Sequence, residues 1–421
     1  MKESILTIPV AQMRLPKDWC LTTLGDACDF LDSKRKPVNN SVREHRIAGK
    51  SKSELYPYYG ANGQVGWIDD FIFDESLILL AEDGGPFGST EKPISYPVSG
   101  KCWVNNHAHV LRPRAMMDFD FCTFALSIRP DVGNMVTGST RPKLNQETAT
   151  KILIPLPPLP TQRRIAAQLK EQLAEVDRAR TALQVQLDAA KALPAAALRT
   201  EFGKATSDNL STGAGELPSN WRWSKLEEEC ALLPSKSIQS HGDAIVSAIT
   251  SACLTETGFD VKGLKVARMA LTQVQECKVS NGEVLVARSN TPELVGRVAL
   301  FNGEVEDIVA SDLTIRLWPH ERVMGGFLAA FLSFLFVSGY WRERASGASG
   351  TMKKITRSQI QQLLIPTPPL STQKAIVIRL RSEISEAARL RAALETKLAT
   401  LDRLPSALLR QVFGEVSSGN N

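Results

Sequence analysis

Two short segments of this 421-residue chain combine side chains that could read the edges of DNA bases. The segment Tyr58-Tyr59-Gly60-Ala61-Asn62-Gly63-Gln64 places two amides beside two tyrosines. An Asn or Gln amide can pair bidentately with adenine, and an arginine can do so with guanine. The segment Arg288-Ser289-Asn290-Thr291 offers both groups. Structural turns would have the same composition, so both readings stay open.

Short basic clusters are candidates for phosphate contacts. A solvated surface is the simpler reading of any single cluster, including Arg112 with Arg114 and Arg357 beside Lys354. From the clusters and the two turn segments together, we predict a DNA-contacting set: Lys34, Arg35, Lys36, Tyr58, Tyr59, Asn62, Gln64, Arg141, Lys143, Arg288, Ser289, Asn290, Lys353 and Lys354. Within it, base contacts are expected from Tyr59, Asn62, Gln64, Arg288, Asn290 and Lys354.

Motifs that would carry catalysis are missing from the sequence. It has no GxxxxGK[ST] phosphate loop, no GxSxG elbow, no HExxH zinc helix and no Asn/Asp-Pro-Pro-Tyr/Phe methyltransferase signature. Only His107 and His109 are spaced to share one face of a strand, and we interpret them as structural. The seven cysteines form no CxxC or His/Cys cluster, so buried thiols are expected. The pattern favours a binding protein with neither catalytic residues nor a metal site.

Composition predicts a folded protein of two or three domains, with 43% apolar and 23% charged residues. No long apolar run or signal peptide is evident, so a soluble cytoplasmic protein is expected. The 50 basic residues exceed the 45 acidic ones only slightly. Residues 158–204 and 369–421 each hold eight Lys/Arg and five Asp/Glu, which accounts for the whole excess. DNA contacts elsewhere would therefore depend on local clusters.

An internal repeat organises the chain. Residues 152–203 align without a gap on residues 363–414, with 23 of 52 positions identical. Upstream, Leu15-Pro16-Lys17-Asp18-Trp19 returns as Leu217-Pro218-Ser219-Asn220-Trp221 at a different offset. We therefore expect two globular domains and two helical spacers in alternation, with these limits: domains 1–157 and 205–368, spacers 158–204 and 369–414, and a tail at 415–421.

Each spacer predicts a long helix of about 33 residues behind a proline-rich connector. Thr161 and Thr372 are the expected N-caps, and Pro194 and Pro405 are expected to end or kink the helices. Apolar residues recur at spacings of three and four, which is a heptad seam. The expected seam comprises Leu169, Leu173, Val176, Leu183 and Leu187, and then Leu380, Ile384, Leu394, Leu398 and Leu401.

Two such seams in one chain would most simply bury each other, and a duplicated unit related by a two-fold axis favours antiparallel packing. Arg180 and Arg391 fall on the seams, where we expect them to reach Glu175 or Glu386, with a role in setting register as the alternative.

The sequences between the spacers predict α+β domains. Strands are expected at residues 77–81 and 101–111 in the first domain. In the second, strands are expected at 283–287, 296–301 and 313–318, with a buried helix at 327–341. The predicted fold class is thus α+β, with two globular domains separated by two long helices packed as an antiparallel coiled coil, in a pseudo-two-fold internal repeat.

This arrangement resembles the specificity subunit of type I DNA restriction-modification enzymes. The resemblance rests on the Leu-Pro-x-x-Trp openings and on Ala81-Glu82-Asp83-Gly84-Gly85 beside the tyrosine segment. It also rests on residues 285–296 and on the connectors Ile154-Pro155-Leu156-Pro157-Pro158-Leu159-Pro160-Thr161-Gln162 and Ile365-Pro366-Thr367-Pro368-Pro369-Leu370-Ser371-Thr372-Gln373. In place of the glutamate that many members of the family carry before the glutamine, this chain has threonine.

The resemblance implies that each domain reads one half of a split, asymmetric site in double-stranded DNA. The helices would space the domains and dock two methyltransferase subunits, through which restriction subunits join. A 33-residue helix is about 50 Å long, against about 34–36 Å for one turn of DNA. No cofactor is expected on this chain, whereas S-adenosylmethionine, ATP and Mg are expected on the partner subunits. The alternatives are a self-contained methyltransferase or nuclease with an unrecognised site, and a coiled-coil scaffold without a role at DNA.

Overall fold

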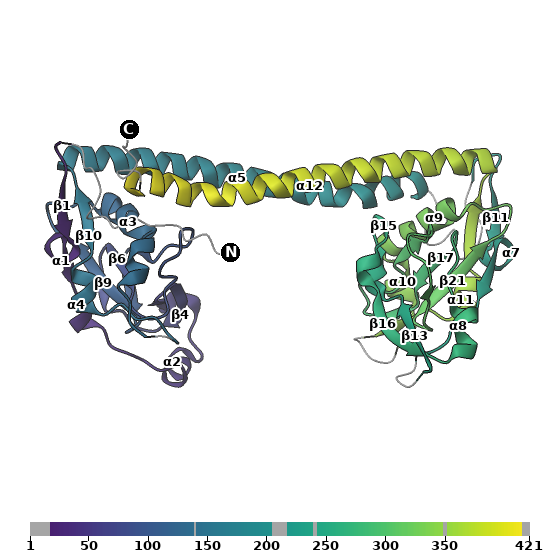
Figure 1. Cartoon of the computed structure of the whole chain (residues 1–421), viewed down its shortest axis with the longest axis horizontal. Coiled ribbons are helices and arrows are strands. Elements are labelled where there is room, and N and C mark those ends of the chain that lie inside the picture. Colours follow the sequence, from purple (N-terminus) through teal and green to yellow (C-terminus); the bar gives the residue numbers. More distant parts are fainter. Residues whose placement is uncertain (1–16, 139, 204–216, 239–241, 348–351, 415–421) are drawn as a thin grey trace. The chain divides into compact units, whose positions relative to one another are not determined.

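The computed structural model describes residues 17–138, 140–203, 217–238, 242–347 and 352–414. The chain divides into two compact units, one of residues 1–183 with 397–421 and one of residues 184–396. Each unit holds a globular domain together with one end of each long helix (Figure 1). Part of the expected opening, Leu15-Pro16, and the tail 415–421 lie outside the described residues.

Unit 1 is built on two four-stranded sheets and one strand pair. The antiparallel sheet has the order β2-β9-β6-β7, the mixed sheet has the order β4-β3-β8-β5, and β1 pairs with β10. The strands are β1 (Cys20–Thr23), β2 (Cys28–Phe30), β3 (Tyr56–Gly60), β4 (Gly63–Ile68), β5 (Phe73–Asp74), β6 (Leu77–Ala81), β7 (Ser95–Val98), β8 (Lys101–Val104), β9 (Ala108–Pro113) and β10 (Leu153–Leu156). The helices of the domain are α1 (Leu24–Ala27), α2 (Asn40–Ile47), α3 (Phe119–Ser127) and α4 (Gln146–Thr150).

Unit 2 has sheets β12-β21-β17-β19 and β16-β13-β20, and the strand pairs β11-β23, β14-β15 and β18-β22. The strands are β11 (Arg222–Lys225), β12 (Cys230–Leu233), β13 (Ala244–Ala248), β14 (Leu254–Thr255), β15 (Gly258–Phe259), β16 (Lys265–Met269), β17 (Val284–Ala287), β18 (Ser289–Asn290), β19 (Val298–Leu300), β20 (Ile308–Val309), β21 (Thr314–Pro319), β22 (Lys353–Lys354) and β23 (Leu364–Thr367). The helices are α7 (Leu226–Glu229), α8 (Leu271–Cys277), α9 (Gly325–Val337), α10 (Tyr340–Arg344) and α11 (Arg357–Gln361).

The two domains share their connectivity. The sheet β2-β9-β6-β7 corresponds to β12-β21-β17-β19, and the parallel pair β3-β8 corresponds to β13-β20. The hydrogen bond from Leu24 N to Ile152 O is repeated as Leu226 N to Leu363 O, both at 2.8 Å. The duplication that the sequence shows clearly only in the spacers therefore extends through the cores of the domains.

The predicted α+β fold class is confirmed, and two of the expected elements differ in detail. The single strand expected at 101–111 is wrong, because Asn105 accepts a hydrogen bond from the His107 amide and makes a turn between β8 and β9. The helix expected at 327–341 stops at Val337, since Gly339 has φ +83° and starts the separate helix α10.

The long helices are α5 (Leu159–Phe202) and α12 (Leu370–Gly414). Each begins two residues before its expected N-cap threonine, with the carbonyls of Pro158 and Pro369 accepting the first amides. The sequence predicted that Pro194 and Pro405 would end or kink the helices. Neither helix ends there: α5 continues through Pro194 to Phe202, and α12 continues through Pro405 to Gly414. An internal proline costs about 3 kcal/mol, and burial of the apolar residues that follow it offsets this cost.

The helix ends pack antiparallel within each unit. In unit 1, Leu169 near the start of α5 clusters with Leu409 near the end of α12. In unit 2, Phe202 at the end of α5 belongs to the same core as Leu380 near the start of α12, and Glu201 pairs with Arg379. Of the expected seam residues, Leu169, Leu187, Leu380 and Leu394 are buried, and the others are half-buried.

The seam arginines do not have the partners expected for them. Arg180 pairs with Asp177 at 3.1 Å and Arg391 with Glu395 at 3.7 Å. Glu175 is instead bound by Arg178. Both seam arginines thus pair with acids of their own helix, one turn away.

Among the described residues, no helix is both long enough and apolar enough to cross a membrane. Six cysteines are buried as expected, but Cys20 is exposed on β1. Burial raises the pKa of Cys102 to about 11 and that of Cys230 to about 12.

We predict that Phe202→Ala destabilises the protein more than the equivalent change Phe413→Ala. Phe202 is 2% exposed and packs its ring against Phe327, Phe331 and Phe334, whereas Phe413 is half-buried against Phe121. Truncating a buried phenylalanine costs about 3–5 kcal/mol of unfolding free energy. Urea unfolding of the two variants measures the difference, and equal losses would contradict it.

Candidate nucleic-acid interface

A short segment after β6, Glu82-Asp83-Gly84-Gly85, binds three of the predicted contact residues of the first domain: Arg35, Asn62 and Lys143. Glu82 binds Arg35 at 2.7 Å and Lys143 at 3.1 Å. The Gly84 carbonyl accepts a hydrogen bond from the Asn62 amide at 3.2 Å, and the Gly84 amide donates to Pro142 O. Side chains that are far apart in sequence thus contact the same four-residue segment.

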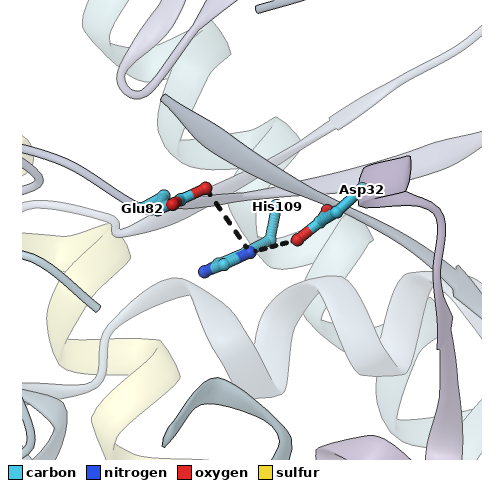
Figure 2. Close-up of side chains that lie close together, drawn as sticks. All are labelled: Asp32, Glu82 and His109. Atoms are coloured by element: carbon cyan, nitrogen blue, oxygen red, sulfur yellow. Dashed lines mark hydrogen bonds and ion pairs between the residues drawn. The ribbon is translucent and has the colours of Figure 1, made fainter. Parts of the chain in front are cut away.

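Glu82 of this segment also belongs to a cluster of titratable side chains with Asp32 and His109 (Figure 2). His109 Nδ1 lies 2.6 Å from Asp32 Oδ2, and Nε2 lies 2.8 Å from the carbonyl oxygen of Leu144. Asp32 also accepts the Val110 amide at 2.9 Å. Asp32 comes from η2 (Asp32–Lys34), Glu82 directly follows β6, and His109 comes from β9.

The cluster has the donor atoms of a metal site, but its bonds are those of a salt-bridge network. Both ring nitrogens of His109 face oxygen acceptors, and Arg35 and Lys143 already supply cations to Glu82. The hydrogen bond that Lys143 donates to the Glu82 carboxylate raises the pKa of Lys143. His107 lies in the turn before β9 and pairs with Asp83 at 3.0 Å, so the two histidines do not share a strand.

The predicted DNA-contacting residues of the first domain divide by exposure. Lys34, Lys36, Asn62, Gln64, Arg141 and Lys143 are exposed. Arg35 is half-buried in its ion pairs, and Tyr58 is 4% exposed with its hydroxyl donating to Val38 O. Desolvation by burial raises the pKa of both Tyr58 and Tyr59 above the usual range of a tyrosine. Contact with DNA stays a prediction for the whole set.

In the second domain, the structure joins two predicted clusters in one strand pair. Ser289 and Asn290 form β18, which pairs with Lys354 and Lys353 of β22. Asn290 Oδ1 accepts the Thr291 amide at 2.9 Å, so this side chain also shapes the turn. Residues more than 60 positions apart thus form one basic and amide-bearing ribbon.

Arg288 has internal partners beside this ribbon. Its guanidinium donates to Ile355 O at 3.4 Å and to Asp312 O at 3.2 Å. The Arg112 and Arg114 cluster of the first domain is also paired, with Glu75 and Asp29. These bonds give each arginine a structural role, and its role at DNA stays a prediction.

Helix α2 is a feature that the sequence analysis missed. It has no buried residue, yet it is held beside β4 by Arg46, which pairs with Asp69, and by Arg43, which lies over the Tyr58 ring. Val42 and Ile47 are the only apolar residues among its eight, too few to indicate a helix from apolar spacing. It adds basic side chains next to the Asn62 and Gln64 turn.

The structure defines a protein of two equivalent α+β domains, each joined to an antiparallel pair of helix ends. The chain belongs to the type I restriction modification DNA specificity domain family, whose profile matches residues 16–184 and 218–398. The two matches give one copy of the family domain in each half of the chain.

Named relatives and solved structures agree with this family. The MjaVIII specificity subunit of Methanocaldococcus jannaschii is 22% identical over 395 residues, covering 88% of this chain and 87% of that protein. A putative specificity subunit of Haemophilus influenzae is 30% identical over 142 residues, about a third of either chain (34% of each). The crystal structure of the HsdS subunit from Thermoanaerobacter tengcongensis has the same fold, with a TM-score of 0.57, 20% identity and coverage of 96% and 98%. A chain from a study of type I system assembly gives a TM-score of 0.65 at 18% identity, with coverage of 95% and 98%.

We predict that Glu82→Ala is far more destabilising than Lys143→Ala. Removing Glu82 takes away the nearer of the two carboxylates that pair with Arg35, at 2.7 Å against 3.4 Å for Asp32, in a site where the Arg35 and Glu82 side chains are 13% and 12% exposed. Breaking a buried pair costs about 3–5 kcal/mol. The Lys143 side chain is 48% exposed, so its loss is expected to cost at most about 1 kcal/mol. Chemical denaturation of both variants tests this order, and a Lys143 effect as large as that of Glu82 would contradict it.

Proposed function

We propose that this chain is the DNA-specificity subunit of a type I restriction-modification complex. Each domain reads one half of a split, asymmetric DNA site, and the chain itself performs no catalysis. The observation that carries the proposal is that two domains of equal connectivity present different polar segments, while the helices attached to them repeat one sequence in register, with 23 of 52 positions identical. Two domains with the same strand connectivity but different contact residues are suited to binding two different half-sites.

The chemistry of the exposed residues supports recognition through local contacts. Asn62 and Gln64 offer amides for adenine, and Lys353 and Lys354 offer cations beside Asn290. Phosphate contacts from such clusters supply affinity and register, and amide contacts with base edges supply specificity.

The repeated helices support two equivalent docking sites for methyltransferase subunits. Leu193 of α5 and Leu404 of α12 occupy the same repeat position and are 45% and 37% exposed. An exposed leucine at equivalent positions is suited to an apolar contact made twice by the same partner. Restriction subunits would join through the methyltransferases. S-adenosylmethionine, ATP and Mg belong to those partners, and the complex works in the cytoplasm.

We predict a methylation pattern that depends on the chain. Cells that carry the partner subunits are compared with and without this chain by sequencing methylated adenines across the genome. A split, asymmetric motif that appears only with the chain is the expected result. An unchanged methylome, or a motif that is continuous or palindromic, would overturn the proposal.

We further predict that Asn62→Ala and Lys354→Ala alter different halves of that motif. Asn62 belongs to the first domain and Lys354 to the second, so each change should relax base preference in one half-site and leave the other intact. Losing one good base contact costs about 1–3 kcal/mol of discrimination. Binding by the assembled complex to cognate and scrambled duplexes is the control, since an equal loss on both would show a phosphate or folding role.

A further inference from the structure

The first turn of α5 carries a buried glutamine whose whole amide is bonded to the backbone of the first domain. Gln162 is 1% exposed. Its Nε2 donates to Pro157 O at 2.8 Å and to Met116 O at 3.0 Å, and its Oε1 accepts the Asp118 amide at 2.8 Å. One side chain therefore joins the proline connector, the long helix and the loop that precedes α3.

Gln373, the equivalent residue of α12, repeats all three bonds in the second domain. It is 0% exposed, and its Nε2 donates to Pro368 O and Arg322 O, both at 2.8 Å. Its Oε1 accepts the Met324 amide, also at 2.8 Å. Two independent domains thus attach to their helices through the same set of atoms.

The loops that receive these bonds have unrelated side chains. Met116-Met117-Asp118 in the first domain stands where the second has Arg322-Val323-Met324. Because the glutamine bonds only to main-chain groups, it holds either loop whatever its sequence. Such a joint tolerates changes in the side chains of the domain loop, while the hydrogen bonds between the loop and the long helix stay the same.

The two backbone amides that donate to the glutamine oxygens lie at the starts of domain helices α3 and α9. Asp118 is the N-cap of α3, and Met324 is the N-cap of α9. Each helix packs on its own domain, α3 against the cluster with Ile154 and α9 against β19. The glutamine therefore ties the direction of the long helix to an element that moves with the sheet of the domain.

We propose that Gln162 and Gln373 are positioning residues that fix the angle between each recognition domain and its long helix, and thereby limit the spacer length accepted between the half-sites. This rests on the function proposed above. A rigid joint confines the two half-sites to one separation, and a loosened joint admits neighbouring separations without altering base contacts.

The test uses the complex assembled with its methyltransferase and a library of sites with the natural spacer or one base pair more or less. Gln162→Glu and Gln373→Glu keep the acceptor but lose the donor to two carbonyls. Each is expected to raise methylation at the altered spacers, relative to the natural one, by about tenfold, equivalent to about 1.4 kcal/mol. The bases preferred in each half-site should stay the same. Gln146→Glu makes the same chemical change at an exposed position of α4 and is expected to leave the ratio unchanged.

An activity loss that is equal at all spacers, an unchanged ratio, or altered base preference would overturn the proposal. If a glutamate variant melts well below the wild type, the uncharged Gln162→Met and Gln373→Met variants take its place. Misfolding of these as well would show a purely structural role and overturn the proposal too. Absence of a split motif with the unmodified chain would instead overturn the proposed function, which separates the two failures.

Discussion

The apolar seam of each long helix is the constraint on which the rest of the structure depends. A single helix with one such face cannot leave it in water without losing the free energy of burial. In each unit the start of one helix meets the end of the other, and both also pack on the domain core. The seam therefore joins residues of the first repeat to residues of the second, and each domain packs on helix ends supplied by both repeats.

Much of this was predictable because the signals are periodic or repeated. The gapless alignment of 152–203 on 363–414 predicted two equivalent spacers, and the heptad spacing predicted an apolar seam on each. Their antiparallel packing was predicted from the two-fold symmetry of a duplicated unit. Helix limits were less accurate, since a proline rule applied to Pro194 and Pro405 does not count the burial of Phe202 gained by continuing the helix. Tertiary packing decided the length where local preference indicated a stop.

The candidate interface was predicted only as separate fragments. Nothing local in the sequence indicates that Asp32, Glu82 and His109 meet, because their contacts span 27 to 77 positions and follow from sheet topology. The same holds for Asn290 beside Lys353. Gln162 and Gln373 were visible as parts of a repeated motif, but their role depends on backbone groups that sequence does not show. Residue type identifies candidates, whereas the fold decides which of them have internal partners.

Antiparallel pairing of the helix ends is the central claim, and distances between spin labels test it most directly. With Cys20, the exposed native thiol, replaced by serine, labels are placed on exposed positions: Lys170→Cys with Arg410→Cys, and Thr200→Cys with Glu383→Cys. Each pair flanks an antiparallel contact within its own unit, next to Leu169 with Leu409 and next to Glu201 with Arg379. The account predicts strong dipolar coupling for both pairs. Weak coupling in these pairs, with strong coupling between the repeat-equivalent positions 170 and 381, would mean a parallel pair and contradict it.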